Sequence, residues 1–81
     1  MAVELTLLSR RFCHLCHAME AALAPLAAEF GAAVTVVDVD GDPLLEAQYD
    51  ELVPVLLHGK NELCHYFLDE PKTHEYLAAI R

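Results

Sequence analysis

Apolar and polar residues alternate near the start of the chain and then recur at a longer period. Over Val3–Leu8, apolar residues first occupy every second position, which predicts a strand. Over Cys13–Phe30, apolar residues return at helical spacing, which predicts an amphipathic helix. Gly31 would end that helix. Because Pro25 stands inside it, we expect the helix to bend or restart there.

A β-branched run and a turn come next. Val34–Val39 is β-branched and mostly apolar, which predicts a strand covered on both faces. The sequence Gly41-Asp42-Pro43 then predicts a turn, with Asp42 capping a short helix and Pro43 as its first residue. We expect this helix to run to about Leu52.

The last third of the chain predicts a hairpin and a helix. Val55–His58 and Glu62–Phe67 read as strands joined by Gly59-Lys60-Asn61, a loop short enough to make them antiparallel. Pro71 should open a final helix. Its expected buried side consists of Tyr76, Leu77 and Ile80.

The predicted order is therefore β-α-β-α-β-β-α, an α/β arrangement. A strand, helix and strand at the front imply a parallel crossover, and the hairpin adds two antiparallel strands to the same sheet. Helices should cover both faces. With 81 residues the chain is long enough for one small domain, so we expect residues 1–81 to form a single unit.

Charge and hydropathy narrow the classes of partner. Thirteen acidic against five basic residues give a net charge of −8, which opposes binding to nucleic acid or to an anionic bilayer. The stretch Ala21–Ala28 is uncharged but far too short to span a membrane. The first basic residues follow the first apolar stretch, unlike the order in a secretory signal, so we expect a cytoplasmic protein.

Two of the three cysteines form a C-x-x-C motif, Cys13-His14-Leu15-Cys16, between the first strand and the first helix. This spacing places both sulfurs on one turn, with Cys13 at the positive end of the helix, where a thiolate is stabilised. We predict that Cys13 is the nucleophile and that Cys16 resolves the mixed disulfide. Arg10, Arg11 and His14 add local positive charge; alternatively, both arginines are ordinary solvated loop charges.

The same residues allow other interpretations. Cys13, Cys16 and His17, with Cys64 or His65, supply the ligand types of a zinc site, and thiolates also hold iron–sulfur clusters. Residues 13–17 also spell the haem-attachment pattern C-x-x-C-H, which the predicted strands disfavour. Cys64 is most simply a small buried apolar residue, with a third redox thiol as the alternative.

Taken together, a strand, C-x-x-C and helix, followed by Leu52-Val53-Pro54-Val55 and a glycine hairpin, resemble the thioredoxin superfold. More specifically, they look like the glutaredoxins and the small bacterial glutaredoxin-like proteins. The resemblance implies a four-stranded mixed sheet flanked by three helices, and a cis Val53-Pro54 bond beside the C-x-x-C. It also implies thiol-disulfide oxidoreductase activity, with backbone groups of Val53 pairing with an extended substrate.

Two departures from the glutaredoxin pattern bear on the substrate. His14-Leu15 replaces the usual Pro-Tyr, and Cys64-His65 lies near the usual Gly-Gly pair, with Asp69 following slightly late. A side chain at Cys64 would obstruct the close backbone approach that glycines permit. We therefore expect the chain to act on a protein disulfide or to bind glutathione weakly.

These observations predict an oxidoreductase that works through the Cys13/Cys16 dithiol, on a protein disulfide or a glutathione mixed disulfide. Arg10, Arg11, His14, Val53 and Pro54 are the candidate substrate-binding residues. We expect a monomer with no bound metal or cofactor, and glutathione as a reductant or substrate. The alternative is a binding module of the same fold that carries zinc or an iron–sulfur cluster without redox turnover.

Overall fold

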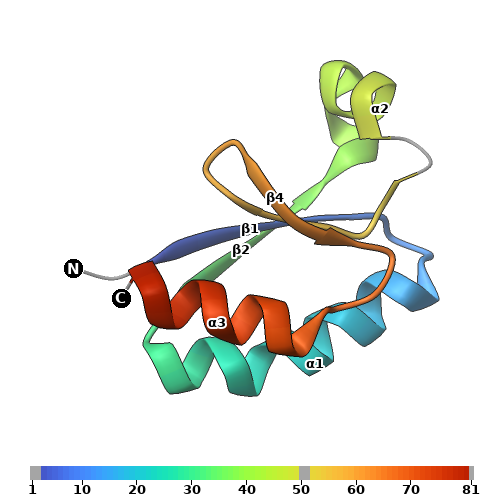
Figure 1. The fold of residues 1–81 in the computed structure, drawn as a ribbon. Coiled ribbons are helices and arrows are strands. Elements are labelled where there is room, and N and C mark those ends of the chain that lie inside the picture. Colours follow the sequence, from blue (N-terminus) through green and yellow to red (C-terminus); the bar gives the residue numbers. More distant parts are fainter. Residues whose placement is uncertain (1–2, 50–51, 81) are drawn as a thin grey trace.

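The computed structural model describes residues 3–49 and 52–80. Four strands form one mixed sheet in the order β2-β1-β3-β4. The pair β1–β2 is parallel, and the pairs β1–β3 and β3–β4 are antiparallel. The predicted order of elements and the mixed sheet are thereby confirmed (Figure 1). The strands are β1 (Glu4–Ser9), β2 (Ala33–Asp38), β3 (Val55–His58) and β4 (Asn61–His65).

The parallel pair is connected by α1 (His14–Phe30). Gly31 ends this helix in the left-handed conformation, with φ of 64°, as its lack of a side chain allows. Pro25 lies within α1, which continues through it as one helix, so the expected restart does not occur. Because Pro25 is exposed, its ring is accommodated at the helix surface, although proline removes a backbone hydrogen bond there.

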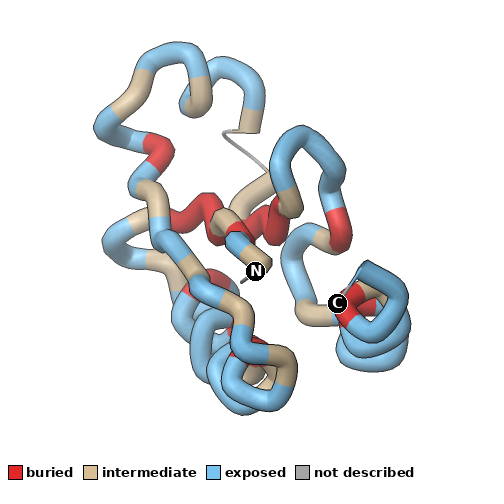
Figure 2. The backbone as a smooth tube through the Cα atoms, turned by 90° about the vertical axis from the view of Figure 1, so that its left-hand side faces the viewer, coloured by how far each residue is buried: buried red, intermediate tan, exposed pale blue. Residues whose placement is uncertain are grey.

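The two faces of the sheet carry unequal cores. Helices α1 and α3 (Glu70–Ile80) lie on one face (Figure 1), where Leu5 and Leu7 pack with Leu77 and other apolar residues of both helices. On the other face, Leu8 belongs to a smaller cluster against which α2 (Pro43–Tyr49) packs. Figure 2 shows the buried backbone concentrated in the middle of the molecule, with mostly exposed helices around it. The alternation of β1 thus directs its side chains to both faces.

The prediction that the β-branched strand is covered on both faces is wrong. β2 lies at the edge of the sheet, most of its residues are exposed, and Val36 keeps 45% of its surface accessible. The β-branched residues indicated a strand, but they did not indicate how far that strand is buried. Ile80 is similarly exposed at 38%, whereas Leu77 of the same helix is fully buried.

The hairpin and the helix ends differ slightly from expectation. His58 pairs with Asn61, so the loop is shorter than predicted. β4 ends at His65 because Tyr66 adopts a left-handed φ of 65°, which interrupts the extended backbone. A turn (Val39–Gly41) precedes α2, which ends at Tyr49; the residues between Tyr49 and Leu52 lie outside the described part.

Side chains accept hydrogen bonds at the starts of α2 and α3, and of these the Asp42 cap was predicted. Asp42 accepts hydrogen bonds from the backbone N–H groups of Leu44 (2.9 Å) and Leu45 (3.3 Å), as expected of an N-cap. The last helix begins at Glu70, one residue before Pro71, and Asp69 accepts from the N–H of Lys72 at 3.1 Å. Within the described residues, no helix is long and apolar enough to cross a membrane.

Candidate active site

The C-x-x-C motif lies where β1 leads into α1. Cys13 is the N-cap of the helix, with extended backbone angles (φ −127°, ψ 108°). Its Sγ accepts a hydrogen bond from the N–H of Cys16 at 3.1 Å. The two cysteines are joined by a disulfide, and their Cα atoms lie 5.2 Å apart. Cys13 therefore performs the capping role usually taken by Ser, Asp or Asn, with sulfur as the acceptor.

The two cysteines differ in exposure. Cys16 is completely buried, on the face of α1 that packs toward the sheet, whereas Cys13 is partly exposed. His14 and Leu15 between them are both exposed. An incoming molecule can therefore reach one sulfur of the pair and not the other.

The Val53-Pro54 segment lies at the same end of the sheet as the C-x-x-C. Val55 pairs with Leu8 near the end of β1, and the antiparallel register places the start of β3 beside the exit toward α1. The Val53-Pro54 peptide bond is cis, as the resemblance implied. Pro54 is buried and Val53 is partly buried.

The predicted basic residues are arranged differently from one another. The Arg10 guanidinium contacts Asp40, with its Nε and one terminal nitrogen each 3.1 Å from Oδ1. Part of its charge is therefore directed at a carboxylate that lies 30 residues away in the sequence. Arg11 is exposed and lines a groove that also includes Arg10 and His17. A role for Arg10, Arg11 or His14 in substrate binding stays a prediction.

The structure adds a groove that the motifs did not indicate. It begins at Leu15, between the two cysteines, and its opposite wall is the turn after β4, where Phe67 is 70% exposed. From the sequence, Tyr66 and Phe67 could be either core residues or groove lining. No local pattern distinguishes the two, because the turn reaches α1 only through the tertiary fold. The groove is lined by Leu15, Ala18, Met19, Ala22, Tyr66, Phe67, Leu68 and Glu70.

The residues suggested for a metal site do not form one cluster, although Cys13 and Cys16 are joined to each other. Among residues 3–49 and 52–80, no three His, Cys, Asp or Glu side chains form a group that could hold a metal ion. Cys64 is a free, partly buried thiol that packs against the cluster formed by α1, α3 and the sheet. In the described part of the chain, Cys13 and Cys16 therefore belong to no group of three such side chains.

A model of the glutaredoxin-like domain family (DUF836) matches residues 4–78, which is nearly the whole chain. The chain belongs to this family. The glutaredoxin-like assignment agrees with the β2-β1-β3-β4 sheet and with the cysteine pair at the start of α1. A pair at disulfide distance in this position fits a redox function. A search of curated proteins found no match.

Solved structures support the same assignment for this glutaredoxin-like chain. Protein Ne2328 from Nitrosomonas europaea is 36% identical, with a TM-score of 0.82, and the match covers 94% of this chain and 92% of that one. Protein XcR50 from X. campestris is 38% identical, with a TM-score of 0.75 and coverage of 93% and 96%. Thioredoxin 1 from Thermosipho africanus, 21% identical with a TM-score of 0.64 and coverage of 95% and 97%, shows the shared thioredoxin fold alone.

Proposed function

We propose that this glutaredoxin-like protein catalyses thiol-disulfide exchange through Cys13 and Cys16. The observation that supports this most directly is the unequal exposure of two cysteines held on one helical turn. Cys13 is accessible and lies at the helix N-terminus, whereas Cys16 is fully buried beside it. A nucleophile must be reached by its substrate, and a resolving thiol must reach only the nucleophile.

The exchange proceeds in two displacements. The Cys13 thiolate attacks one sulfur of the substrate disulfide, forms a mixed disulfide and releases the first substrate thiolate, which takes up a proton. The Cys16 sulfur, after losing its proton, then attacks Sγ of Cys13 and releases the second substrate thiol. The substrate gains two electrons and two protons, and the enzyme is left with the Cys13–Cys16 disulfide. Two glutathione molecules, or one protein dithiol, then supply two electrons and two protons to the Cys13–Cys16 disulfide; the reductant leaves as a disulfide and the enzyme returns to the dithiol form.

The N-cap position of Cys13 favours the first displacement. The N–H of Cys16 points at the Cys13 sulfur, and the positive end of the α1 dipole lies there as well. Both interactions stabilise a negative sulfur. We place this chemistry in the cytoplasm, where reducing systems keep dithiols available, and in a monomeric chain.

Substitution of each cysteine tests the proposal. The rate of reduction of a small disulfide, such as 2-hydroxyethyl disulfide, should fall to the uncatalysed background in Cys13→Ser. The Cys16→Ser variant should instead accumulate a mixed disulfide, seen by mass spectrometry as a mass increase on Cys13. Cys64→Ser is the matched control and should keep the wild-type rate. Wild-type exchange in Cys13→Ser would show that Cys13 is not the nucleophile.

A further inference from the structure

Two backbone donors of the turn between β4 and α3, and one at the start of α3, are bonded within the protein. The N–H of Tyr66 donates to the carbonyl of Pro54 (2.9 Å), and that of Phe67 donates to the carbonyl of His65 (2.8 Å). At the start of α3, the N–H of Lys72 donates to the Asp69 carboxylate (3.1 Å). A carboxylate of an incoming ligand could bind one of these three donors only by displacing its acceptor. At α3 it would also meet the negative charge of Asp69.

The groove beside the dithiol is apolar with an acidic end. Leu15 forms one wall and Phe67 the other, and Glu70 is the charged residue among those that line it. Such a groove suits an apolar side chain and a positive charge near Glu70. It disfavours a ligand that carries a carboxylate at each end, as glutathione does.

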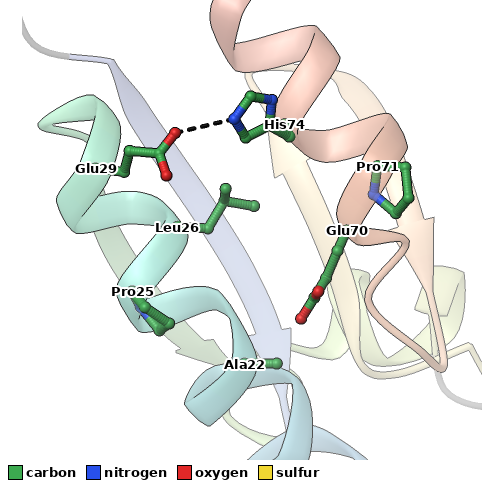
Figure 3. Close-up of a pocket in the computed structure, with 7 residues that line it drawn as sticks. All are labelled: Ala22, Pro25, Leu26, Glu29, Glu70, Pro71 and His74. Atoms are coloured by element: carbon green, nitrogen blue, oxygen red, sulfur yellow. Dashed lines mark hydrogen bonds and ion pairs between the residues drawn. The ribbon is translucent and has the colours of Figure 1, made fainter.

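This groove continues along the helices. Ala22 and Glu70 also line a second groove between α1 and α3 (Figure 3), which extends past Pro25 to Glu29 and His74. In the close-up, the Glu70 side chain extends from α3 toward α1, and Glu29 contacts His74 at 2.9 Å. Glu70 therefore lies where the two grooves meet, and Glu29 lies at the far end of the second groove.

The length of the combined groove exceeds the reach of a tripeptide. From Leu15 to Pro25, α1 advances by about 15 Å, at 1.5 Å per residue. An extended chain would need about four or five residues to follow it, at roughly 3.3 Å per residue. A tripeptide fixed by its cysteine sulfur at Cys13 would reach only the first part, whereas a protein segment can follow the whole groove.

We propose that the substrate is a disulfide within an extended protein segment, and not free oxidised glutathione. An apolar residue next to the substrate cysteine packs between Leu15 and Phe67, and a Lys or Arg about four residues away faces Glu70. This inference rests on the proposed function, since the same Cys13 performs the exchange. Contacts outside the C-x-x-C motif would then allow the protein to distinguish one disulfide substrate from another.

The experiment compares second-order rates at which the reduced full-length protein reduces four disulfides. These are 2-hydroxyethyl disulfide, oxidised glutathione, a peptide disulfide with Leu beside its cysteine and Lys four residues further on, and the same peptide with Glu in place of Lys. The Lys peptide should react about tenfold faster than oxidised glutathione, because part of an apolar side chain is buried. It should also react about two- to fivefold faster than the Glu peptide, as a partly exposed ion pair would produce.

Variants assign these preferences to the groove. Glu70→Gln should reduce the ratio between Lys and Glu peptides toward one. Phe67→Ser should lower the rate for both peptides relative to that for 2-hydroxyethyl disulfide by about three- to tenfold. Leu44→Ser, a change at an exposed apolar residue of α2, is the matched control and should leave all ratios unchanged.

The outcomes separate the two proposals. If the wild-type protein does not reduce 2-hydroxyethyl disulfide, the proposed function itself is wrong. If it does, but oxidised glutathione reacts as fast as the Lys peptide, or Glu70→Gln keeps the full Lys preference, the exchange stands and the inferred substrate class is wrong.

Discussion

Thr73 lies near the start of α3 with its side chain completely buried. Its backbone N–H donates to the carbonyl of Asp69 at 2.9 Å, but its hydroxyl oxygen has no hydrogen-bond partner among the described residues. A buried hydroxyl without a partner costs about 1–3 kcal/mol, because it has lost its hydrogen bonds to water and gained none. The native chain therefore carries a local destabilisation that a single substitution can remove.

Replacing Thr73 by Val exchanges the hydroxyl for a methyl group of nearly the same shape. The two residues have similar helix propensities, so the backbone contribution should change little. We expect Thr73→Val to raise the free energy of unfolding by about 1–3 kcal/mol. For a domain of this size, each 1 kcal/mol should raise the melting temperature by about 4–8 °C.

Urea denaturation followed by far-UV circular dichroism, with calorimetry for the melting temperature, measures this change. Thr35→Val is the control, because Thr35 is exposed on β2, and it should stay within about 0.5 kcal/mol of wild type. Thr73→Ser keeps the hydroxyl and loses a buried methyl group, so it should lower stability by about 1 kcal/mol. A Thr73→Val protein no more stable than wild type would refute the reasoning and show that the hydroxyl is satisfied.

Two glycines and two aspartates provide further matched tests by the same urea method and by amide hydrogen exchange. Gly31→Ala should lower stability by about 1 kcal/mol, since φ at Gly31 is 64° although nothing lies within 4 Å of an added Cβ. Gly41 has the same free space around an added Cβ but no positive φ, so Gly41→Ala should leave stability unchanged or raise it by up to about 1 kcal/mol. An equal loss of stability in Gly31→Ala and Gly41→Ala would contradict this reasoning. Asp42→Ala should speed amide exchange in α2, because it removes a cap worth about 1 kcal/mol. Asp40→Ala removes an exposed ion pair and should speed exchange in α2 less. Faster exchange in Asp40→Ala than in Asp42→Ala would be inconsistent with the capping role.

Residues with strong local conformational preferences made most element boundaries predictable. Gly31 and Asp42-Pro43 mark helix ends through φ, the missing proline N–H and side-chain capping, which act within a few residues. The short glycine loop likewise identified the hairpin. These effects are local, so they can be inferred without knowing the tertiary fold.

Features that depend on tertiary neighbours were not predictable. Whether β2 is central or at an edge depends on strand order, and its β-branched residues are compatible with both. The left-handed φ of Tyr66 occurs at a residue type with no preference for it, so the end of β4 was misplaced.

The candidate site likewise contains features that local sequence determines and features that only the tertiary fold determines. The C-x-x-C motif was sufficient to place Cys13 and Cys16 at the start of a helix, because their spacing is itself the signal. The Arg10 contact with Asp40 joins residues distant in sequence, and the groove wall at Phe67 comes from the turn after β4, a strand at the edge of the sheet. Neither has a local signature.

The apolar cluster beneath α2 is smaller than the one beneath α1 and α3. No side chain of α2 over Pro43–Tyr49 is fully buried, whereas α1 contributes four buried residues to its face of the sheet. Partial opening of the α2 lobe should therefore need less free energy than disruption of the helix that carries the cysteines. Substitutions in α2 should therefore be tolerated among relatives. Substitutions in the core beneath α1 and α3 should be tolerated less, because that core holds the two sulfurs in place.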